Sequence, residues 1–247
     1  MMMASARVSY KPLPVNPAPE CSRGRPGNKL RQTFLKTGII TEATGSAYME
    51  LQSDTGLSTK VICAVFGPRQ QKKSYTFSES GNIWCDFKYA PFANKGSRQS
   101  RLGQSDQERF LSRSIEKALY EAIRFDTFPK SVLEVYILVL ENDGGDIEAG
   151  ITCASAAIAN AGVEMYDLVT AVSAGVDSEG QIALDPADGD MGKTKATLSM
   201  AFITSSQKIT YCNMVGNASE TVTAKLAESC LDGCSQLAFV VRTVLTS

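Results

Sequence analysis

The chain has 247 residues, of which 43% are hydrophobic, and its formal net charge is −1. This is enough apolar material to bury a normal core, in one large domain or two small ones. A charge near zero argues against a free-standing nucleic-acid binder, although a local basic patch remains compatible with it. The sequence contains no histidine, which excludes Ser-His-Asp, Cys-His and His-ligated zinc mechanisms.

The first 29 residues are rich in proline and lack the apolar core of a secretory signal. We expect a flexible arm over residues 1–29 and a single domain over residues 30–247. No segment reaches the roughly 20 apolar residues of a membrane helix, so no membrane partner is expected. Seven scattered cysteines predict reduced thiols in an intracellular protein rather than a disulfide framework. Cys153, Cys230 and Cys234 are interpreted as packing residues, because no zinc-ligand spacing accompanies them.

The segment up to residue 92 reads as mostly antiparallel β-structure. Residues 37–52 alternate around Thr44-Gly45-Ser46, which predicts two strands joined by a turn at that point. Residues 60–67 form a buried strand, and residues 81–92 alternate as a further strand. Ser105 and Glu108 then form a capping-box pattern that opens an amphipathic helix, predicted to end near Phe128-Pro129.

The second half of the chain repeats both types of element. Residues 132–141 have the pattern of a central strand, and residues 147–161 are small residues that allow a helix to approach a sheet closely. Gly162 is a plausible stop for that helix. Strands are predicted at residues 168–173, 181–184, 196–203 and 208–214, followed by a helix over 220–245. The order of four strands, helix, strand, helix, four strands and helix predicts an α+β fold rather than a doubly wound sheet.

The stretch GGDIEAG at residues 144–150 presents a conflict of chemistry. A glycine turn that opens a helix exposes N–H groups suited to an anion. Asp146 and Glu148 would compete with that anion, and acidic residues commonly stabilise the first turn of a helix. From the residues themselves, the turn caps its own helix more readily than it binds phosphate.

Two polar clusters are candidate sites. Asp185, Asp188 and Asp190 share one loop, which suits either Mg²⁺ binding and acid catalysis or an ordinary solvated turn. The second is a basic segment with Gly, Ser and Gln interspersed, which suits either a phosphate backbone or a solvated face. Its candidate RNA-binding residues are Lys95, Arg98, Arg101, Arg109 and Arg113.

Several stretches in order resemble the RNase PH family of phosphorolytic ribonucleases and the exosome ring subunits related to it. They include Gly45-Ser46-Ala47-Tyr48, the strand ending in Gly67-Pro68-Arg69, Ala90-Pro91-Phe92, and the run from Asn142-Asp143-Gly144-Gly145 to Asp167-Leu168-Val169. The resemblance covers roughly residues 30–245 and is greatest to eukaryotic ring subunits of the mRNA-transport-regulator type. It implies the RNase PH-like fold (ribosomal S5 domain 2-like), with mixed sheets packed against helices.

The resemblance also implies that the chain is not an enzyme. Active members follow the two glycines with a hydroxyl residue and an arginine that hold phosphate, whereas this chain has Asp146 and Ile147. Active members also carry an aspartate pair, of which Asp190 matches the first and Thr197 stands at the second. No catalytic residue, metal or cofactor is therefore expected.

The function implied is that of a non-catalytic structural ring subunit of the RNA exosome core, which supports 3′–5′ RNA processing and degradation and contributes to the RNA channel. The expected partners are other RNase PH-like ring subunits in a hetero-oligomeric ring, S1/KH cap subunits and single-stranded RNA. The expected locations are the nucleus, nucleolus and cytoplasm. The alternatives are an active phosphate-dependent 3′–5′ exoribonuclease, with its site rebuilt from other residues, and a free-standing RNA-binding module, which the near-zero charge disfavours.

Overall fold

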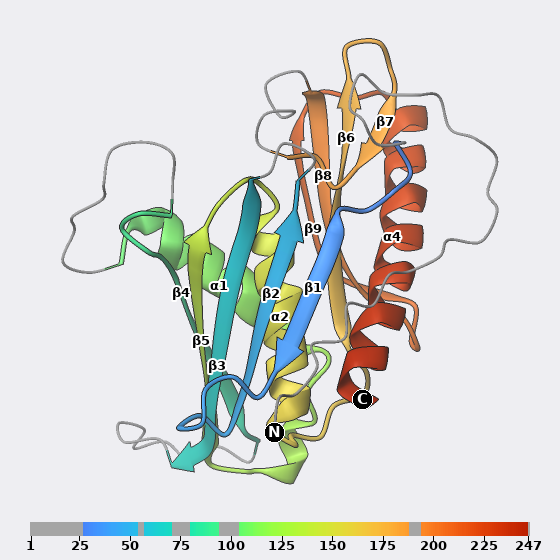
Figure 1. The fold of residues 1–247 in the computed structure, drawn as a ribbon. Helices are drawn as coiled ribbons and strands as arrows, with labels where there is room; N and C mark the ends of the chain where they lie inside the picture. Colours follow the sequence, from blue (N-terminus) through green and yellow to red (C-terminus); the bar gives the residue numbers. More distant parts are fainter. Residues whose placement is uncertain (1–26, 54–56, 71–79, 94–103, 188–193, 247) are drawn as a thin grey trace.

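The computed structural model describes residues 27–53, 57–70, 80–93, 104–187 and 194–246. The described elements follow one another as four strands, a helix, a strand, a helix, four strands and a long last helix, with one short 3₁₀ turn at Phe125–Thr127. This order confirms the predicted α+β class. The predicted arm over residues 1–29 lies almost wholly outside the described residues. Figure 1 shows two sheets side by side with helices between and beside them.

The first sheet has five strands in the order β1-β2-β3-β5-β4. Their bounds are Gln32–Thr37 (β1), Gly45–Gln52 (β2), Ser58–Gln70 (β3), Asn82–Tyr89 (β4) and Ser131–Glu141 (β5). β5 lies in the interior of the sheet between β3 and β4, as its apolar sequence predicts. Alternate side chains along β5 face the core. Val135, Ile137 and Val139 are buried, whereas Tyr136 and Leu138 are exposed.

One detail of this sheet corrects the prediction. The first hairpin does not turn at residues 44–46, because Gly45 and Ser46 already pair with Val65 and Ala64 of β3; the loop occupies residues 38–44 between β1 and β2. β4 pairs with β5 in parallel, which makes this sheet mixed, as the RNase PH-like fold predicts. The helix α1 connects these two strands, and a crossover of that length joins parallel neighbours.

Helix α1 spans Asp106–Tyr120, and Ser105 and Glu108 form the predicted capping box. The helix ends earlier than the predicted break at Phe128-Pro129. Ile123 instead forms a β-bridge with Met165, and the neighbouring backbone groups bond across the same two segments. Ala122 and Ile123 are therefore buried in an extended segment, which pairs with the chain after α2, and not in the helix.

The second sheet has four antiparallel strands in the order β7-β6-β8-β9. Their bounds are Val169–Asp177 (β6), Ile182–Leu184 (β7), Thr194–Ile203 (β8) and Lys208–Gly216 (β9). Gly27, the first described residue, accepts a hydrogen bond from the Leu184 N–H at 2.7 Å, which ties the start of the described chain to β7.

Helix α2, Asp146–Asn160, lies between the two sheets and packs against β2 and β3 on one side and β6 on the other. Every residue from Ile147 to Ile158 is buried. Ser155 Oγ accepts from the Val169 N–H at 2.9 Å, and Thr152 Oγ1 accepts from the Ala171 N–H at 3.0 Å. Small polar side chains of α2 thus take the place of a neighbouring strand for part of β6.

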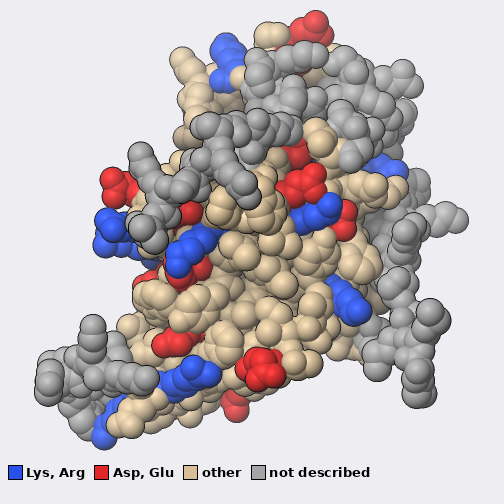
Figure 2. All heavy atoms as spheres, turned by 60° about the vertical axis from the view of Figure 1, so that its left-hand side comes forward, with Lys and Arg blue, Asp and Glu red and all other residues tan. Residues whose placement is uncertain are grey.

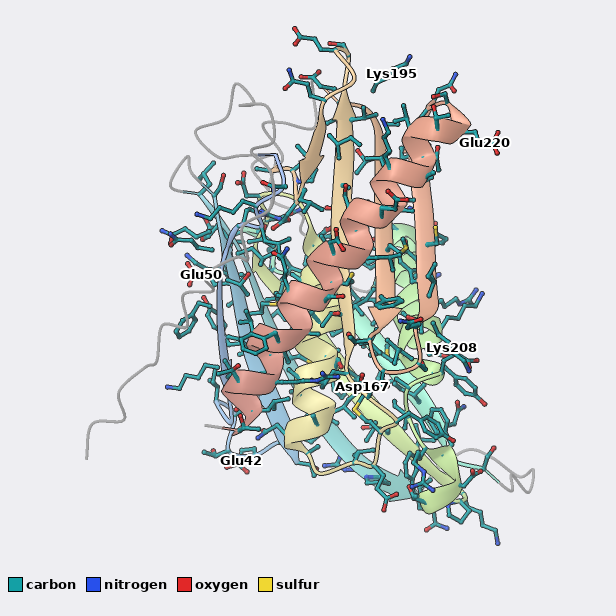
Figure 3. All side chains as sticks on the ribbon, turned by 90° about the vertical axis from the view of Figure 1, so that its right-hand side faces the viewer. Glu42, Glu50, Asp167, Lys195, Lys208 and Glu220 are labelled. Carbon is teal, nitrogen blue, oxygen red and sulfur yellow. The ribbon has the colours of Figure 1, made fainter. Side chains whose placement is uncertain are left out.

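Helix α4, Glu220–Thr246, packs against β6 and β8 and covers the second sheet (Figure 3). The Asp167 carboxylate, labelled in Figure 3, accepts two hydrogen bonds of 2.8 Å from the Arg242 guanidinium near the end of this helix. Cys153, Cys230 and Cys234 are fully buried, which confirms their interpretation as packing residues. None of the described helices is long and apolar enough to cross a membrane.

Candidate functional site: the Gly144-Gly145 turn

The candidate site is the turn that joins β5 to α2. Gly144 and Gly145 have φ values of 83° and 72°, which glycine adopts far more easily than other residues. Gly145 is also the N-cap of α2 and has no side chain to bond the first helical N–H groups. A Cβ atom at Gly145 would lie 2.4 Å from Nη2 of Arg31. The second glycine is therefore required both by the backbone and by a side chain packed behind it.

Arg31, just before β1, fills the space behind this turn with its side chain fully buried. Its guanidinium donates to the carbonyl oxygens of Asp143 (3.3 Å) and Gly144 (2.9 Å) and to Asp185 Oδ1 (2.5 Å). Burial would lower the pKa of Arg31, but the Asp185 carboxylate outweighs it, so the pKa is raised and the charge is held. This cation stabilises the carbonyl side of the turn and is committed to protein groups.

Thr59 of β3 also holds the turn through its hydroxyl group. Its hydroxyl donates to the Gly144 carbonyl at 2.8 Å and accepts from the Asp143 N–H at 3.0 Å. The Asn142 side chain accepts from the Gly144 N–H at 3.0 Å. The glycine turn is thus held by side chains from three separate parts of the chain, which makes it a rigid element.

Asp146 occupies the front of the turn, where the helix N-terminus would meet an anion. Its Oδ1 accepts from the Ile147 N–H at 2.9 Å, and its Oδ2 accepts a short hydrogen bond from the Tyr89 hydroxyl. Burial, followed by the charge of Asp146, raises the pKa of Tyr89, so the phenol stays a donor. The carboxylate therefore uses donors that a bound phosphate would need.

The residue after Asp146 contributes no polar group to this turn. Ile147 is 8% exposed and belongs to the hydrophobic core. Glu148, one residue further, is 6% exposed and hydrogen-bonds the Ser199 side chain of β8. Burial and the neighbouring charges of Asp146 and Asp185 raise the pKa of Glu148 to about 7. A cavity of about 10 Å³ beside Glu148 and Asp185 has room for no more than a water-sized group.

The predicted carboxylate loop is only partly described. Asp185 is 6% exposed and pairs with Arg31, so it serves the turn from behind. Asp188 and Asp190 lie outside the described residues. Thr197 lies within β8, where it pairs with Gly175 and Val215, and is 9% exposed. In the part of the chain that the structure describes, no three His, Cys, Asp or Glu side chains are grouped to hold a metal ion.

The candidate RNA-binding residues divide in the same way. Lys95, Arg98 and Arg101 lie outside the described residues, whereas Arg109 and Arg113 are exposed on the first half of α1. Arg109 makes a 3.4 Å ion pair with Asp106, and both of these side chains are largely solvent-exposed. Such a pair contributes little to stability and leaves the cation available to another anion.

Tyr89 connects this basic helix to the glycine turn. Its backbone N–H donates to Glu108 Oε1 at 3.0 Å, and its hydroxyl donates to Asp146. Two further bonds, from Phe87 N–H to Ser112 Oγ at 2.9 Å and from Gln104 Nε2 to the Phe87 carbonyl at 3.3 Å, hold α1 and the segment just before it against β4. Sequence reasoning did not identify Arg31, Thr59 or Tyr89 as parts of the site, because no local motif marks them and each reaches the turn from a distant segment.

Comparisons with known proteins agree with this architecture. The model of the RNase PH family, described as "3' exoribonuclease family, domain 1", matches residues 29–164. The chain is 36% identical over 222 residues to the Arabidopsis thaliana protein "Exosome complex component RRP41-like", covering 90% of this chain and 82% of that protein. It is 32% identical over 230 residues to the Homo sapiens "Exosome complex component MTR3", covering 86% and 81%.

The solved structure of rice (Oryza sativa) Rrp46 superposes with a TM-score of 0.79 at 24% identity, over 91% of this chain and 99% of that one. This likeness shows the fold, with its two sheets and intervening helix. The match of the family model to residues 29–164, together with the two relatives above 30% identity, shows that the chain belongs to the RNase PH family.

Proposed function

We propose that this protein is a non-catalytic ring subunit of an RNA exosome, which supports 3′–5′ RNA processing and degradation by holding the ring together and lining part of the RNA path. The observation that carries the proposal is the Asp146 carboxylate at the helix N-terminus, bonded to the Ile147 N–H and the Tyr89 hydroxyl. The place at which this type of turn would bind phosphate is therefore already occupied by a carboxylate of the chain itself.

The charge of Asp146 opposes phosphate at this position. Two unit charges about 4 Å apart repel by about 4 kcal/mol at an effective dielectric constant of about 20, or roughly a thousandfold in affinity. Arg31 does not offset this repulsion, because its guanidinium lies behind the turn with its side chain buried and bonded to Asp185. Ile147 supplies neither a hydroxyl nor a cation. Thr197 likewise has no carboxylate for acid catalysis or a metal ion.

Support for the assembly comes from relatives named as exosome components, to which the similarity extends along most of the chain. A ring of different RNase PH-like chains reconciles RNA contact with a net charge of −1, because neighbouring chains share the positive surface. From the resemblance to exosome ring subunits, we also propose S1/KH cap subunits as partners of this chain. We propose the nucleus, nucleolus and cytoplasm as its locations.

The decisive experiment is native mass spectrometry of the tagged protein isolated from its own cells, combined with a phosphorolysis assay on the purified chain. We expect one copy of this chain in an assembly with several different RNase PH-like chains. We also expect no release of nucleoside diphosphates from RNA and inorganic phosphate. A homo-oligomer that releases nucleoside diphosphates would establish the alternative, an active exoribonuclease.

RNA contact is tested separately by charge reversal. Arg109→Glu with Arg113→Glu should weaken cross-linking of single-stranded RNA to this subunit in the assembled complex, because phosphate contacts are electrostatic. Lys208→Glu with Lys225→Glu is the matched control, since these two cations are exposed on β9 and α4. Equal loss in both variants would mean that the α1 residues make no particular contribution. The same reversal of Arg98 and Arg101 tests the loop that precedes α1.

A further inference from the structure

Helix α1 presents one exposed stripe along its length. The helix packs against β4, the last strand in the order of the first sheet (Figure 1). Successive residues of an α-helix are rotated by about 100°, so side chains three, four, seven or eight positions apart share a face. By this spacing, five exposed residues of α1 fall within an arc of about 100°. We name them the α1 stripe: Arg109, Phe110, Arg113, Lys117 and Tyr120.

Two acidic side chains of α1 are used by the neighbouring strand. Glu108 Oε1 accepts from the Tyr89 N–H at 3.0 Å. The Glu116 carboxylate accepts a hydrogen bond from the Cys85 backbone. A helix with acidic residues among its lysines and arginines usually pairs the two along one exposed face. Here these two carboxylates are directed at β4, and the cations of the α1 stripe remain on the solvent side of the helix.

The described protein engages these cations weakly. Arg109 lies 3.4 Å from Asp106, and the two side chains are 62% and 101% exposed. No ion pair between described residues involves Arg113 or Lys117, although both charges act on Glu116. The α1 stripe therefore holds three positive charges in a protein whose net charge is −1.

Other surface cations are closely paired. Lys60 lies 2.7 Å from Glu141, and Lys88 lies 2.6 Å from Asp86. On the side of the protein seen in Figure 2, Lys and Arg occur as separate spots among uncharged residues, several of them beside acidic residues. Nucleic-acid binding depends on cations that can release counterions and meet phosphates. The α1 stripe meets this condition better than the paired cations do.

Aromatic rings lie at both ends of the α1 stripe. Phe110 is 61% exposed and Tyr120 is 47% exposed. The Tyr120 ring stacks on Phe125, with 4.6 Å between centroids and 30° between planes, and Phe125 is itself buried. Tyr120 is therefore held in place from the core side while much of its ring stays in contact with solvent. A ring fixed in this way is a ready platform for a nucleic-acid base.

We infer that the α1 stripe binds single-stranded RNA, with its three cations on phosphates and its two aromatic rings stacked on bases. The inference rests on the proposed function, which supplies the RNA, and it extends the contact from Arg109 and Arg113 along the whole helix. Residues 109–120 span about 16 Å at a rise of about 1.5 Å per residue. Binding of this kind accepts any base, because every base has a face that can stack.

The stacking is tested with the purified full chain and two labelled probes, an oligoadenylate and an abasic oligomer of the same length, by fluorescence anisotropy. Phe110→Leu with Tyr120→Leu keeps apolar bulk but removes both rings. This variant should bind the oligoadenylate about tenfold more weakly and the abasic oligomer as before, because only the first probe has bases to stack. The control is Phe239→Leu, which removes a ring that is 59% exposed on α4 and should change neither affinity. An unchanged chain with no preference for the oligoadenylate would overturn the inference.

The phosphate contacts are tested by the dependence of affinity on salt. Each contact with a single strand contributes about 0.7 to the slope of log K against log salt concentration, so Lys117→Gln should make the slope shallower by about that amount. Lys225→Gln, at an exposed position of α4, is the matched control and should keep the slope of the unchanged chain. An unaltered slope in Lys117→Gln would contradict a contact that runs along the whole helix.

Native mass spectrometry of the same variants separates this inference from the proposed function. The Phe110→Leu, Tyr120→Leu chain should be recovered in the assembly like the unchanged chain. Normal RNA binding with loss from the assembly would overturn the inference, by assigning the α1 stripe to a protein contact. Normal RNA binding with normal assembly would overturn it and leave the proposed function standing. If the unchanged chain prefers the oligoadenylate but is found in no hetero-oligomer, the proposed function fails and the α1 stripe stands as an RNA-binding surface.

Discussion

Replacement of Glu148 by glutamine should remove most of the pH dependence of stability between pH 5 and 8. Glu148 is buried in the first turn of α2, and burial is the main reason that its pKa is raised from 4.5 to about 7. A buried carboxyl group prefers its neutral form, since ionisation in a low dielectric is costly. The folded protein therefore holds a proton at Glu148 at pH 5 that the unfolded chain has largely released.

The magnitude follows from the shift. Each pKa unit corresponds to about 1.4 kcal/mol, so a shift of roughly 2.5 units amounts to about 3 kcal/mol. The folded state binds the proton more tightly than the unfolded state, so the free energy of unfolding falls as pH rises through this window. The free energy of unfolding is unaffected by Glu148 below about pH 4.5, and it has fallen by the full amount above about pH 7. Glutamine cannot ionise and should be more stable than glutamate at pH 8 by up to this amount.

The assay is urea unfolding of the purified chain at pH 5 and pH 8, with reducing agent present. The window is unusually clean, because the sequence contains no histidine to titrate within it. Glu228→Gln, at an exposed position of α4, is the matched control and should keep the pH dependence of the unchanged protein. Parallel pH profiles for the unchanged chain and Glu148→Gln would refute the assignment of the proton to Glu148.

Three further predictions concern the turn and the core. Gly145→Ala should destabilise the protein by about 1–2 kcal/mol because the residue has a left-handed backbone conformation, and further because the new Cβ would lie 2.4 Å from Arg31. Gly162→Ala is the control: it has a φ of 73° and no atom within 4 Å of the new Cβ, so it should show only the backbone cost. Chemical denaturation of both variants checks this, and equal losses would contradict it. Arg31→Met should cost about 3–5 kcal/mol by leaving Asp185 buried without its cation, with Arg31→Lys less severe; a loss under about 1 kcal/mol would show that the pair is dispensable. Among the described cysteines, a thiol reagent should modify Cys212 in the folded protein and the five buried ones only after denaturation, which mass spectrometry of the labelled peptides can check.

Most elements were predictable because their signals are local. The capping box at Ser105 and Glu108 started α1 where expected, and the small residues after Asp146 formed the helix between the sheets. The end of α1 was not predictable. Ala122 and Ile123 continue the apolar spacing, but pairing with Met165 holds them in an extended segment. That competing partner lies about forty positions away in the chain.

The resemblance to the RNase PH family predicted that phosphate binding is lost, since Asp146 and Ile147 stand where active members of that family have a hydroxyl residue and an arginine. What Asp146 does instead required the folded chain, because its partner Tyr89 comes from the end of β4. The same holds for Asp185, which sequence reasoning considered as a metal ligand and which the fold pairs with Arg31.

The sequence by itself therefore determined the class of fold, the order of its elements and the chemical mismatch at GGDIEAG, because turn residues, periodicity and residue type act over a few positions. Tertiary structure decided which side chains support the turn and which carboxyl group has its pKa raised by burial. Arg31 and Asp185 lie 154 positions apart and meet at 2.5 Å. Contacts of that kind depend on how two sheets pack around α2, and burial and charge pairing arise only after that packing is complete.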